Sequence, residues 1–324
     1  MKTQAIQLVE NIPSQHRKLL SVYITFAVFF IANVIMDPTI LTSYSRLWPL
    51  SLQFAPLMLC AMSQSSVMLI GGINLAIGTS LSLMTAVAAV TMGEGPLGIS
   101  RGILLTLVCG MAVGLVMGTV VVLGRLPDII VTLSFSYIWK GIALWLLPVP
   151  GGHIAPAYTA FMNGKSIVPS GILIVVISLI IWKLFKKTKT GLGLYAVGGN
   201  AKSAFESGIN VKKTRIISYV VSGFFLAVAG LILVGQTGSG DPNIGISYQM
   251  NCIAAAVLGG VSFSGGVGQM KGAVLGAFIF TSLVNILFFS GISPFYQYIV
   301  QGLILIVAIG LKAVSYYRKG GDRA

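Results

Sequence analysis

Ten long apolar runs, separated by short polar connections, constrain this chain more than any other feature of its sequence. A helix needs about 20 mostly apolar residues to cross the hydrocarbon core of a bilayer. The residues are 56% hydrophobic and only 9% charged, against about 25% charged in a soluble domain. The sequence therefore predicts an all-α, polytopic membrane helix bundle of about ten spans, forming one domain over residues 1–324. The expected spans are 19–36, 47–70, 73–92, 102–123, 128–147, 168–185, 216–236, 249–262, 272–290 and 297–313.

The eighth run, 249–262, is shorter than the others and ends soon after two glycines. Lipid tolerates a broken helix only where its backbone is buried in protein or lines a cavity. We therefore expect at least one short or broken helix in the bundle. The first run is interpreted as an uncleaved span, because no small-residue cleavage site follows it.

Basic residues divide unevenly between the two sides of the predicted membrane. With the N-terminus inside, seventeen of the 21 Lys and Arg residues fall in inside segments and three fall outside, while Lys140 lies within a span. Cytoplasmic loops carry such an excess of Lys and Arg, so both termini are expected in the cytoplasm. This excess explains the net charge of +14. Nucleic acid is not expected as a partner, because no soluble surface remains to bind phosphates.

No catalytic or nucleotide-binding motif is present. The sequence lacks the P-loop, H-E-x-x-H and G-x-S-x-G patterns, and its three cysteines and two histidines lack metal-ligand spacing. We therefore expect no catalytic residue, no metal site and no cofactor bound by this chain. No acidic residue is predicted at the bilayer midplane, which argues against ion coupling. Lys140 either marks an ion pathway or extends toward the outer interface beside Trp139 and Trp145.

Three glycines, Gly110, Gly114 and Gly118, lie four residues apart in the run 102–123. This spacing puts them on one helix face and lets another helix approach closely. We expect that face to pack within the same chain, with a contact between subunits as the alternative.

The longest cytoplasmic connection, 183–215, carries eight basic residues. Within it, Asn200 is suited to the N-cap of a helix and Gly208 to the position after its C-terminus. A short capped surface helix is predicted, and it needs a partner surface because it is too short to be stable alone. That surface is either the bundle or another protein in the cytoplasm. The residues of interest are Asn200, Ala201, Ala204, Glu206 and Gly208.

Two similar glycine-rich joints occur at 71–78 and 259–266. Each follows an inward-running span and precedes an outward-running one, so we interpret them as equivalent breaks in a weak parallel repeat. Broken backbone exposes polar groups that can line a solute path, and simple turns are the alternative. The candidate pathway residues are Gly72, Asn74, Gly78, Gly260 and Ser262.

These segments carry a family resemblance. The stretch Gly191–Gly208 (GLGLYAVGGNAKSAFESG), with the Ile-Asn-Val that follows it, resembles the cytoplasmic loop of bacterial ribose-type ABC importer permeases. Cys252–Gly276 looks like the second signature of that family, and Gly71–Ser80 (GGINLAIGTS) is similar to a third element. The likeness covers essentially the whole chain, in order.

The resemblance implies a permease for a monosaccharide or similar small neutral polyol in the bacterial cytoplasmic (inner) membrane. It implies four kinds of partner: cytoplasmic ATP-binding subunits, a second permease that is identical or paralogous, an extracytoplasmic sugar-binding protein and the lipid bilayer. ATP would be bound by the partner subunits, and the loop 183–215 would couple to them. Outer segments 148–167 and 237–248 would receive the binding protein.

One residue departs from the family pattern, which usually has Asp where this chain has Asn74. Asn keeps the shape and hydrogen bonding of Asp but not the charge, and a partner permease that retains Asp is one explanation. Two other functions remain open on the residues alone. The first is a self-sufficient secondary transporter of a small neutral solute, and the second is an integral-membrane enzyme, against which the missing catalytic clusters argue.

Overall fold

The computed structural model describes residues 14–38, 44–164 and 168–293, together with six single positions between 296 and 306. Within these residues every named element is an α-helix. The expected span 297–313 lies almost wholly outside the described residues. The helices are α2 (Ser14–Met36), α4 (Tyr44–Met68), α5 (Ile77–Thr91), α6 (Gly95–Gly124), α7 (Asp128–Leu146), α8 (Pro156–Asn163), α9 (Ser170–Lys186), α10 (Lys189–Gly199), α11 (Ala201–Glu206), α12 (Val211–Thr237), α13 (Ile246–Leu258) and α14 (Met270–Phe289).

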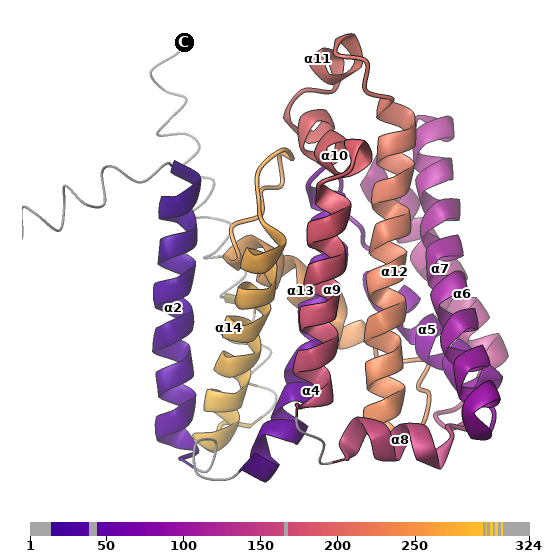
Figure 1. Cartoon of the computed structure of the whole chain (residues 1–324), viewed down its shortest axis with the longest axis vertical. Helices are drawn as coiled ribbons and strands as arrows, with labels where there is room; N and C mark the ends of the chain where they lie inside the picture. The colour runs from indigo at the N-terminus through magenta and orange to yellow at the C-terminus, as the bar shows by residue number, and fades with distance from the viewer. Residues whose placement is uncertain are drawn as a thin grey trace, which may run out of the picture.

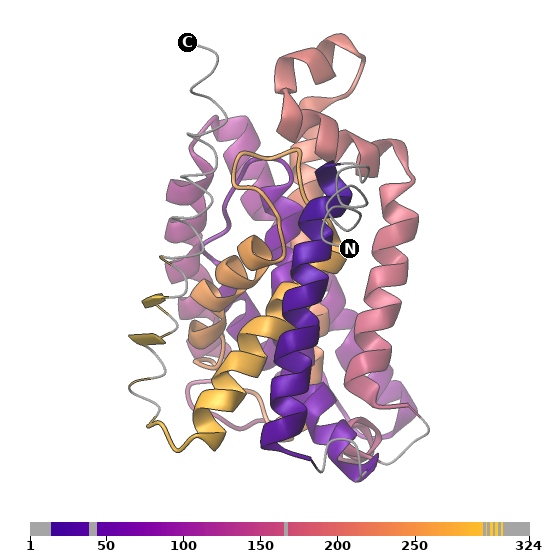
Figure 2. The ribbon, with the colours of Figure 1, turned by 90° about the vertical axis from the view of Figure 1, so that its left-hand side faces the viewer.

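The long helices run roughly side by side along the longest axis of the molecule (Figure 1). The short helices α10 and α11 lie at one end of this bundle, and α8 lies across the other end. We call these the α11 end and the α8 end. The connection between α13 and α14 also reaches the α11 end, where Figure 2 shows it as an open loop.

Among the residues that the structure describes, four helices are long and apolar enough to cross a membrane by length and composition, namely α6, α7, α12 and α14. The predicted all-helical membrane architecture is thereby confirmed. The expected short helix is confirmed at α13, which has 13 residues, and α5 is also short, with 15 residues against 20 in its predicted span 73–92. At 1.5 Å per residue each extends only about 20 Å, short of the roughly 30 Å hydrocarbon core.

An irregular stretch of backbone precedes each of these two short helices. Residues 69–76 lead into α5, and residues 238–245 lead into α13. The stretch 238–245 lies along α5. Thr85 Oγ1 of α5 donates to the carbonyl of Asp241 at 2.9 Å, and the Gly245 amide donates to Ser82 Oγ of α5 at 3.0 Å. These hydroxyls pair backbone groups that no helix satisfies, which makes a broken span tolerable inside a membrane protein.

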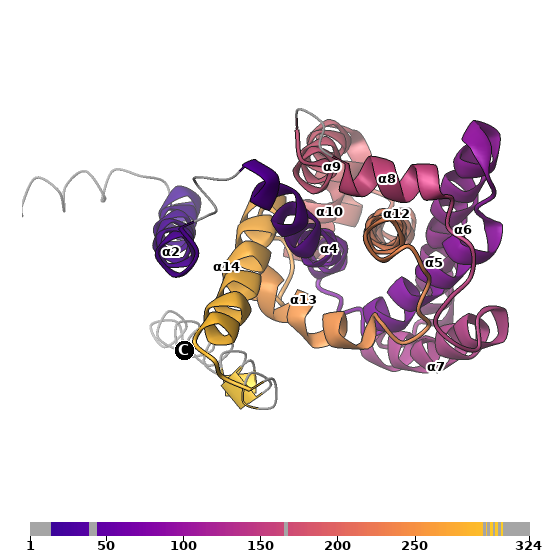
Figure 3. The ribbon, with the colours of Figure 1, turned by 90° about the horizontal axis from the view of Figure 1, so that it is seen from below.

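Helix α12 packs against α4, α5, α6, α8 and α10, and Figure 3 shows it among them in end view. Its close contact with α6 depends on the three spaced glycines. A Cβ on Gly114 would lie 2.1 Å from the Tyr219 carbonyl oxygen, and one on Gly110 would lie 2.5 Å from the Gly223 carbonyl oxygen. At Gly118 the added Cβ would lie 3.0 Å from the Tyr219 side chain. The glycine face thus meets a helix of the same chain.

Candidate functional site

Helix α11 carries the caps that the sequence indicates. The Asn200 side chain accepts hydrogen bonds from the Lys202 and Ser203 amides, both at 3.0 Å. Gly208 follows the helix with a positive φ of 79°, a conformation that glycine adopts without strain. A cap of this kind stabilises a helix by about 1 kcal/mol, which is substantial for an element of 6 residues.

One side of α11 is buried and the other faces outward. Ala204 is buried, whereas the neighbouring Phe205 side chain is 71% exposed. Helix α11 packs on α10 and on the start of α12, so the bundle supplies one of the two expected partner surfaces. Ala201, Glu206 and Gly208 are exposed together with Phe205.

Three backbone segments meet without side chains between them at the α11 end. The Gly266 amide donates to the Leu69 carbonyl at 2.9 Å, which joins the two glycine-rich joints. Gly198, at the end of α10, packs on both, since a Cβ there would lie 1.8 Å from the Leu69 oxygen and 2.5 Å from the Gly266 nitrogen. We call this contact of 69–71, 198–199 and 265–266 the glycine junction. It connects the α10–α11 segment directly to the approaches of α5 and α14.

The candidate pathway residues fall in two different places. Asn74 is fully buried; its Oδ1 accepts from the Ala76 amide at 2.9 Å and its Nδ2 donates to Ser222 Oγ at 3.4 Å. Gly72 and Gly78 are also buried, while Gly260 and Ser262 are partly exposed in the loop at the α11 end. Asn74 therefore holds the irregular backbone before α5 against α12 in this conformation.

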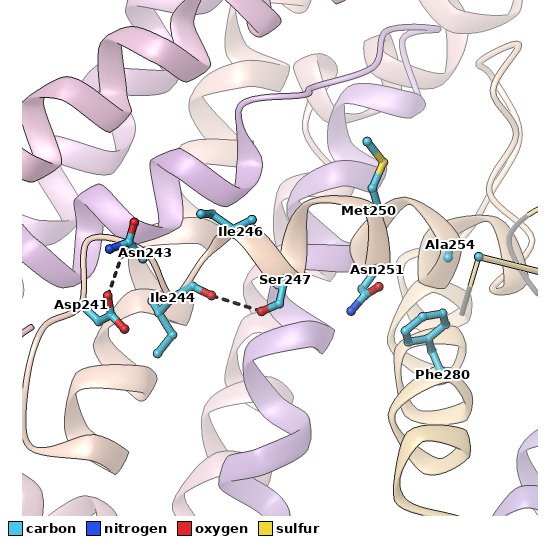
Figure 4. A pocket seen from close by; sticks show the side chains of 10 residues that line it. Asp241, Asn243, Ile244, Ile246, Ser247, Met250, Asn251, Ala254 and Phe280 are labelled. Carbon is cyan, nitrogen blue, oxygen red and sulfur yellow. Dashed lines mark hydrogen bonds between the residues drawn. The ribbon is translucent and has the colours of Figure 1, made fainter. Parts of the chain in front are cut away.

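A hollow with a volume of about 660 Å³ lies beside α13, near these elements. Figure 4 shows polar and apolar side chains of 241–254 along it, with Phe280 of α14 close to Ala254. Gly78 lies directly behind this wall, because a Cβ on it would be 2.5 Å from the Gly245 carbonyl oxygen. The lining residues are Asp241, Asn243, Ile244, Ile246, Ser247, Met250, Asn251, Ala254, Phe280 and Gly302.

Sequence reasoning missed the polar side chains of this cavity. Asn243, Ser247 and Asn251 are spaced by four residues, which is the spacing of one helix face once α13 begins. Asn251 lies within the predicted eighth span, 249–262, but Asn243 and Ser247 precede it. Their alignment with Asn251 depends on the start of α13 at Ile246, which hydropathy alone does not mark.

Lys140 lies at the rim of the same cavity. Its Nζ donates to the Pro242 carbonyl at 2.9 Å and also to Asn243 Oδ1. The amine is thus held by the irregular stretch before α13, whereas the nearby Trp145 side chain is 81% exposed. Lys140 thus borders the polar hollow through Asn243, and both interpretations of this residue stay predictions.

A second hollow, of about 490 Å³, lies between α2, α4, α9 and α14. Its walls are almost wholly apolar and include the packed rings of Phe26, Phe54 and Phe278. It has few groups that could pair with a polar solute. The cavity beside α13 is therefore the better candidate for solute contact.

Known proteins of similar sequence agree with these features. Residues 48–309 match the family described as branched-chain amino acid transport system / permease component. The galactose/methyl galactoside import permease protein MglC of Escherichia coli (strain K12) is 31% identical over 92% of this chain and 95% of its own length. The ribose import permease protein RbsC of Bacillus subtilis (strain 168) is 34% identical over 78% of this chain and 79% of its own. No solved structure matches the chain.

Each of these matches covers more than two thirds of the chain, and the family match, 48–309, includes the α4–α5 joint, the α10–α11 loop and α13. The resemblance to sugar-importer permeases drawn from the sequence is confirmed. The chain belongs to this family of membrane-embedded permease components of transport systems.

Proposed function

We propose that this chain is the membrane subunit of an ATP-driven importer (an ABC importer) for a monosaccharide or a similar small neutral polyol. The observation that carries the proposal is its end-to-end similarity to galactose and ribose import permeases. The family description instead mentions branched-chain amino acids. The neutral polar side chains of the cavity beside α13, Asn243, Ser247 and Asn251, support the sugar class, since amides and a hydroxyl suit neutral hydroxylated solutes.

The energy source in this proposal lies on other chains. The sequence has no P-loop, so ATP is bound and hydrolysed by cytoplasmic partner subunits, and this chain binds no cofactor. The loop 183–215 docks on them through α11, with Phe205 as the exposed apolar contact and with Asn200, Ala204 and Gly208 maintaining the helix. The glycine junction then passes the displacement of α10–α11 to the two joints.

The membrane arrangement follows from the charge distribution. The chain crosses the bacterial inner membrane ten times, with both termini and the α11 end in the cytoplasm. An extracytoplasmic binding protein delivers solute to the α8 end, and a second permease, identical or paralogous, completes the path. In this arrangement Gly72, Asn74 and Gly78 support the wall of the path from behind, while Gly260 and Ser262 lie near its inner mouth.

Reconstitution in liposomes tests the proposal. We expect uptake of radiolabelled galactose or ribose only when the ATPase subunits, the binding protein and ATP are all present. Uptake by the purified chain alone under a proton or sodium gradient would establish the alternative, a self-sufficient secondary transporter. ATP-dependent uptake of leucine but of neither sugar would assign the amino-acid class instead.

A further inference from the structure

The cavity beside α13 has one polar face. Asn243, Ser247 and Asn251 succeed one another at intervals of four residues and all line the hollow of about 660 Å³ (Figure 4). Small-molecule sites usually have volumes of about 300–1,000 Å³ and combine apolar walls with a few placed polar groups. The cavity meets both conditions.

The Asn251 carboxamide makes no hydrogen bond to any residue that the structure describes, although it is only partly exposed. Two other amides of the bundle are paired, since Gln53 Nε2 donates to Asn285 Oδ1 at 2.8 Å and Asn74 is bonded at both ends, whereas the fully buried Gln64 carboxamide, which does not line the cavity, has no partner among the described residues. A carboxamide without a partner inside a membrane protein is unfavourable unless water or a ligand pairs with it. Asn251 is therefore available to a polar solute.

The rim of the cavity is fixed in place before any solute arrives. Asp241 Oδ1 accepts from the Asn243 amide at 2.7 Å, and Lys140 donates to the Asn243 side-chain oxygen. Asn243 is thus left with its side-chain N–H groups as donors. The carboxylate of Asp241 and the amine of Lys140 have opposite charges, so the rim has no net charge and suits an uncharged ligand.

The remaining wall is apolar, with Phe280 and Ala254 lying close to Asn251 (Figure 4). The Phe280 ring is only 2% exposed, so it backs this wall and offers no open ring face. An apolar wall opposite hydrogen-bonding amides matches a sugar ring, which has an apolar C–H face and a polar hydroxyl edge. We propose that the permease itself binds one monosaccharide here, with the C–H face on the apolar wall and the hydroxyls on Asn251, Ser247 and Asn243. This inference rests on the proposed function and names the residues that contact the solute.

Thiol protection tests the site without the binding protein. Met250 lines the cavity and is 52% exposed, so Met250→Cys places a reporter there without removing a polar lining group. Cys60 and Cys252 are buried, and Cys109 is replaced by Ala. We expect a membrane-impermeant methanethiosulfonate to label the reporter in membranes, and millimolar galactose or ribose to slow labelling at least threefold, whereas leucine does not.

Two variants that differ by one hydroxyl provide the matched control. When Asn251→Ala is added to the Met250→Cys chain, the sugar concentration that gives half-maximal protection should rise about 2- to 10-fold. This is the range expected for the loss of one hydrogen bond between neutral groups. Asn251→Ser, nearly the same size as Ala, should restore part of the protection. Phe205→Cys, far away on α11, should be labelled at a rate that sugar does not change.

Labelling of Met250→Cys that sugar leaves unchanged would overturn the inference, and so would protection that is equal in the Ala and Ser variants. Protection by leucine instead of sugar would also reject it. ATP-dependent sugar uptake by the assembled importer, with no protection at Met250→Cys, would leave the proposed function standing and reject the site alone. Protection by sugar in a chain that fails the uptake test would support the binding site and count against the proposed function.

Discussion

In the irregular stretch before α5, single side chains form hydrogen bonds with backbone groups that would be paired within a regular helix. Asn74 Oδ1 pairs with the Ala76 amide, and Thr132 Oγ1 accepts from the Leu75 amide at 3.1 Å. Beyond Asn74, Ser222 is bonded to Ser63 at 2.7 Å, and either hydroxyl could be the donor. A rotation of Ser222 would therefore let it donate to a carboxylate as readily as it accepts from an amide.

We therefore expect Asn74→Asp to be tolerated, because the oxygen that accepts from Ala76 is kept and Ser222 can reverse its hydrogen bond. Asn74→Leu, of similar size, leaves the Ala76 amide without this partner and removes one of the two side-chain hydrogen bonds of Ser222, and it should destabilise the protein by about 1–3 kcal/mol. Thermal unfolding in detergent compares the two. An Asp variant no more stable than the Leu variant would show that the charge itself is not tolerated at this buried position.

At the α6–α12 contact, the absence of a side chain sets the distance between helices. A Cβ on Gly114 would lie 2.1 Å from a backbone oxygen of α12, so Gly114→Ala should destabilise the bundle by about 1–3 kcal/mol. Gly141 in α7 has nothing within 4 Å of its added Cβ, and Gly141→Ala should leave the melting temperature unchanged or slightly higher. Equal melting temperatures for the two variants would contradict the role of Gly114.

At the scale of elements, the two adjacent glycines that end α10 have different surroundings. Gly198 lies against the backbone of both glycine-rich joints, whereas a Cβ on Gly199 would meet nothing within 4 Å. Gly198→Ala must separate α10 from these joints, at an overpacking cost of about 1–3 kcal/mol in stability, and we expect it to weaken the coupling between ATP hydrolysis and uptake. Gly199→Ala should transport normally.

The measurement is ATP hydrolysis and sugar uptake by the assembled importer. In the Gly198→Ala variant, hydrolysis should continue while uptake falls, because the ATPase subunits still bind α11 but no longer move the joints. Equal uptake by both alanine variants would remove the glycine junction from the coupling path. Loss of ATPase co-purification in the Gly198→Ala variant would assign Gly198 to docking instead.

How far the sequence predicts an element depends on whether its cause is local. Helix α11 was predicted because Asn200 and Gly208 are neighbours of the bonds they satisfy. The irregular stretch 238–245 was expected only as an outer surface, because its course along α5 depends on Ser82 and Thr85, more than 150 residues away. The cavity was missed for the same reason, since Phe280 and Asn251 come together only after α13 and α14 pack.

At the scale of the whole molecule, the two ends of the bundle differ in kind. The α11 end holds the glycine junction, the capped helix and the basic loop, while the α8 end holds an antiparallel bridge between Gly151 and Gly240. The apolar walls between them account for the many exposed large hydrophobic side chains on α6, α7 and α9, which a bilayer would cover. A path from one end to the other must pass the short helices α5 and α13, where backbone outside the helices reaches the interior.

The orientation of these two ends can be measured in intact cells. Phe205 on α11 is 71% exposed and Phe161 on α8 is 63% exposed, so a cysteine at either position is open to reagents. Because Lys and Arg concentrate on the α11 side, an impermeant maleimide added outside should label Phe161→Cys and spare Phe205→Cys. After permeabilisation both should be labelled to at least a tenfold higher level than the native cysteines. Labelling of Phe205→Cys from outside would show that the molecule has the opposite orientation. Helix α11 would then lie outside the cell, where no cytoplasmic ATPase could bind it.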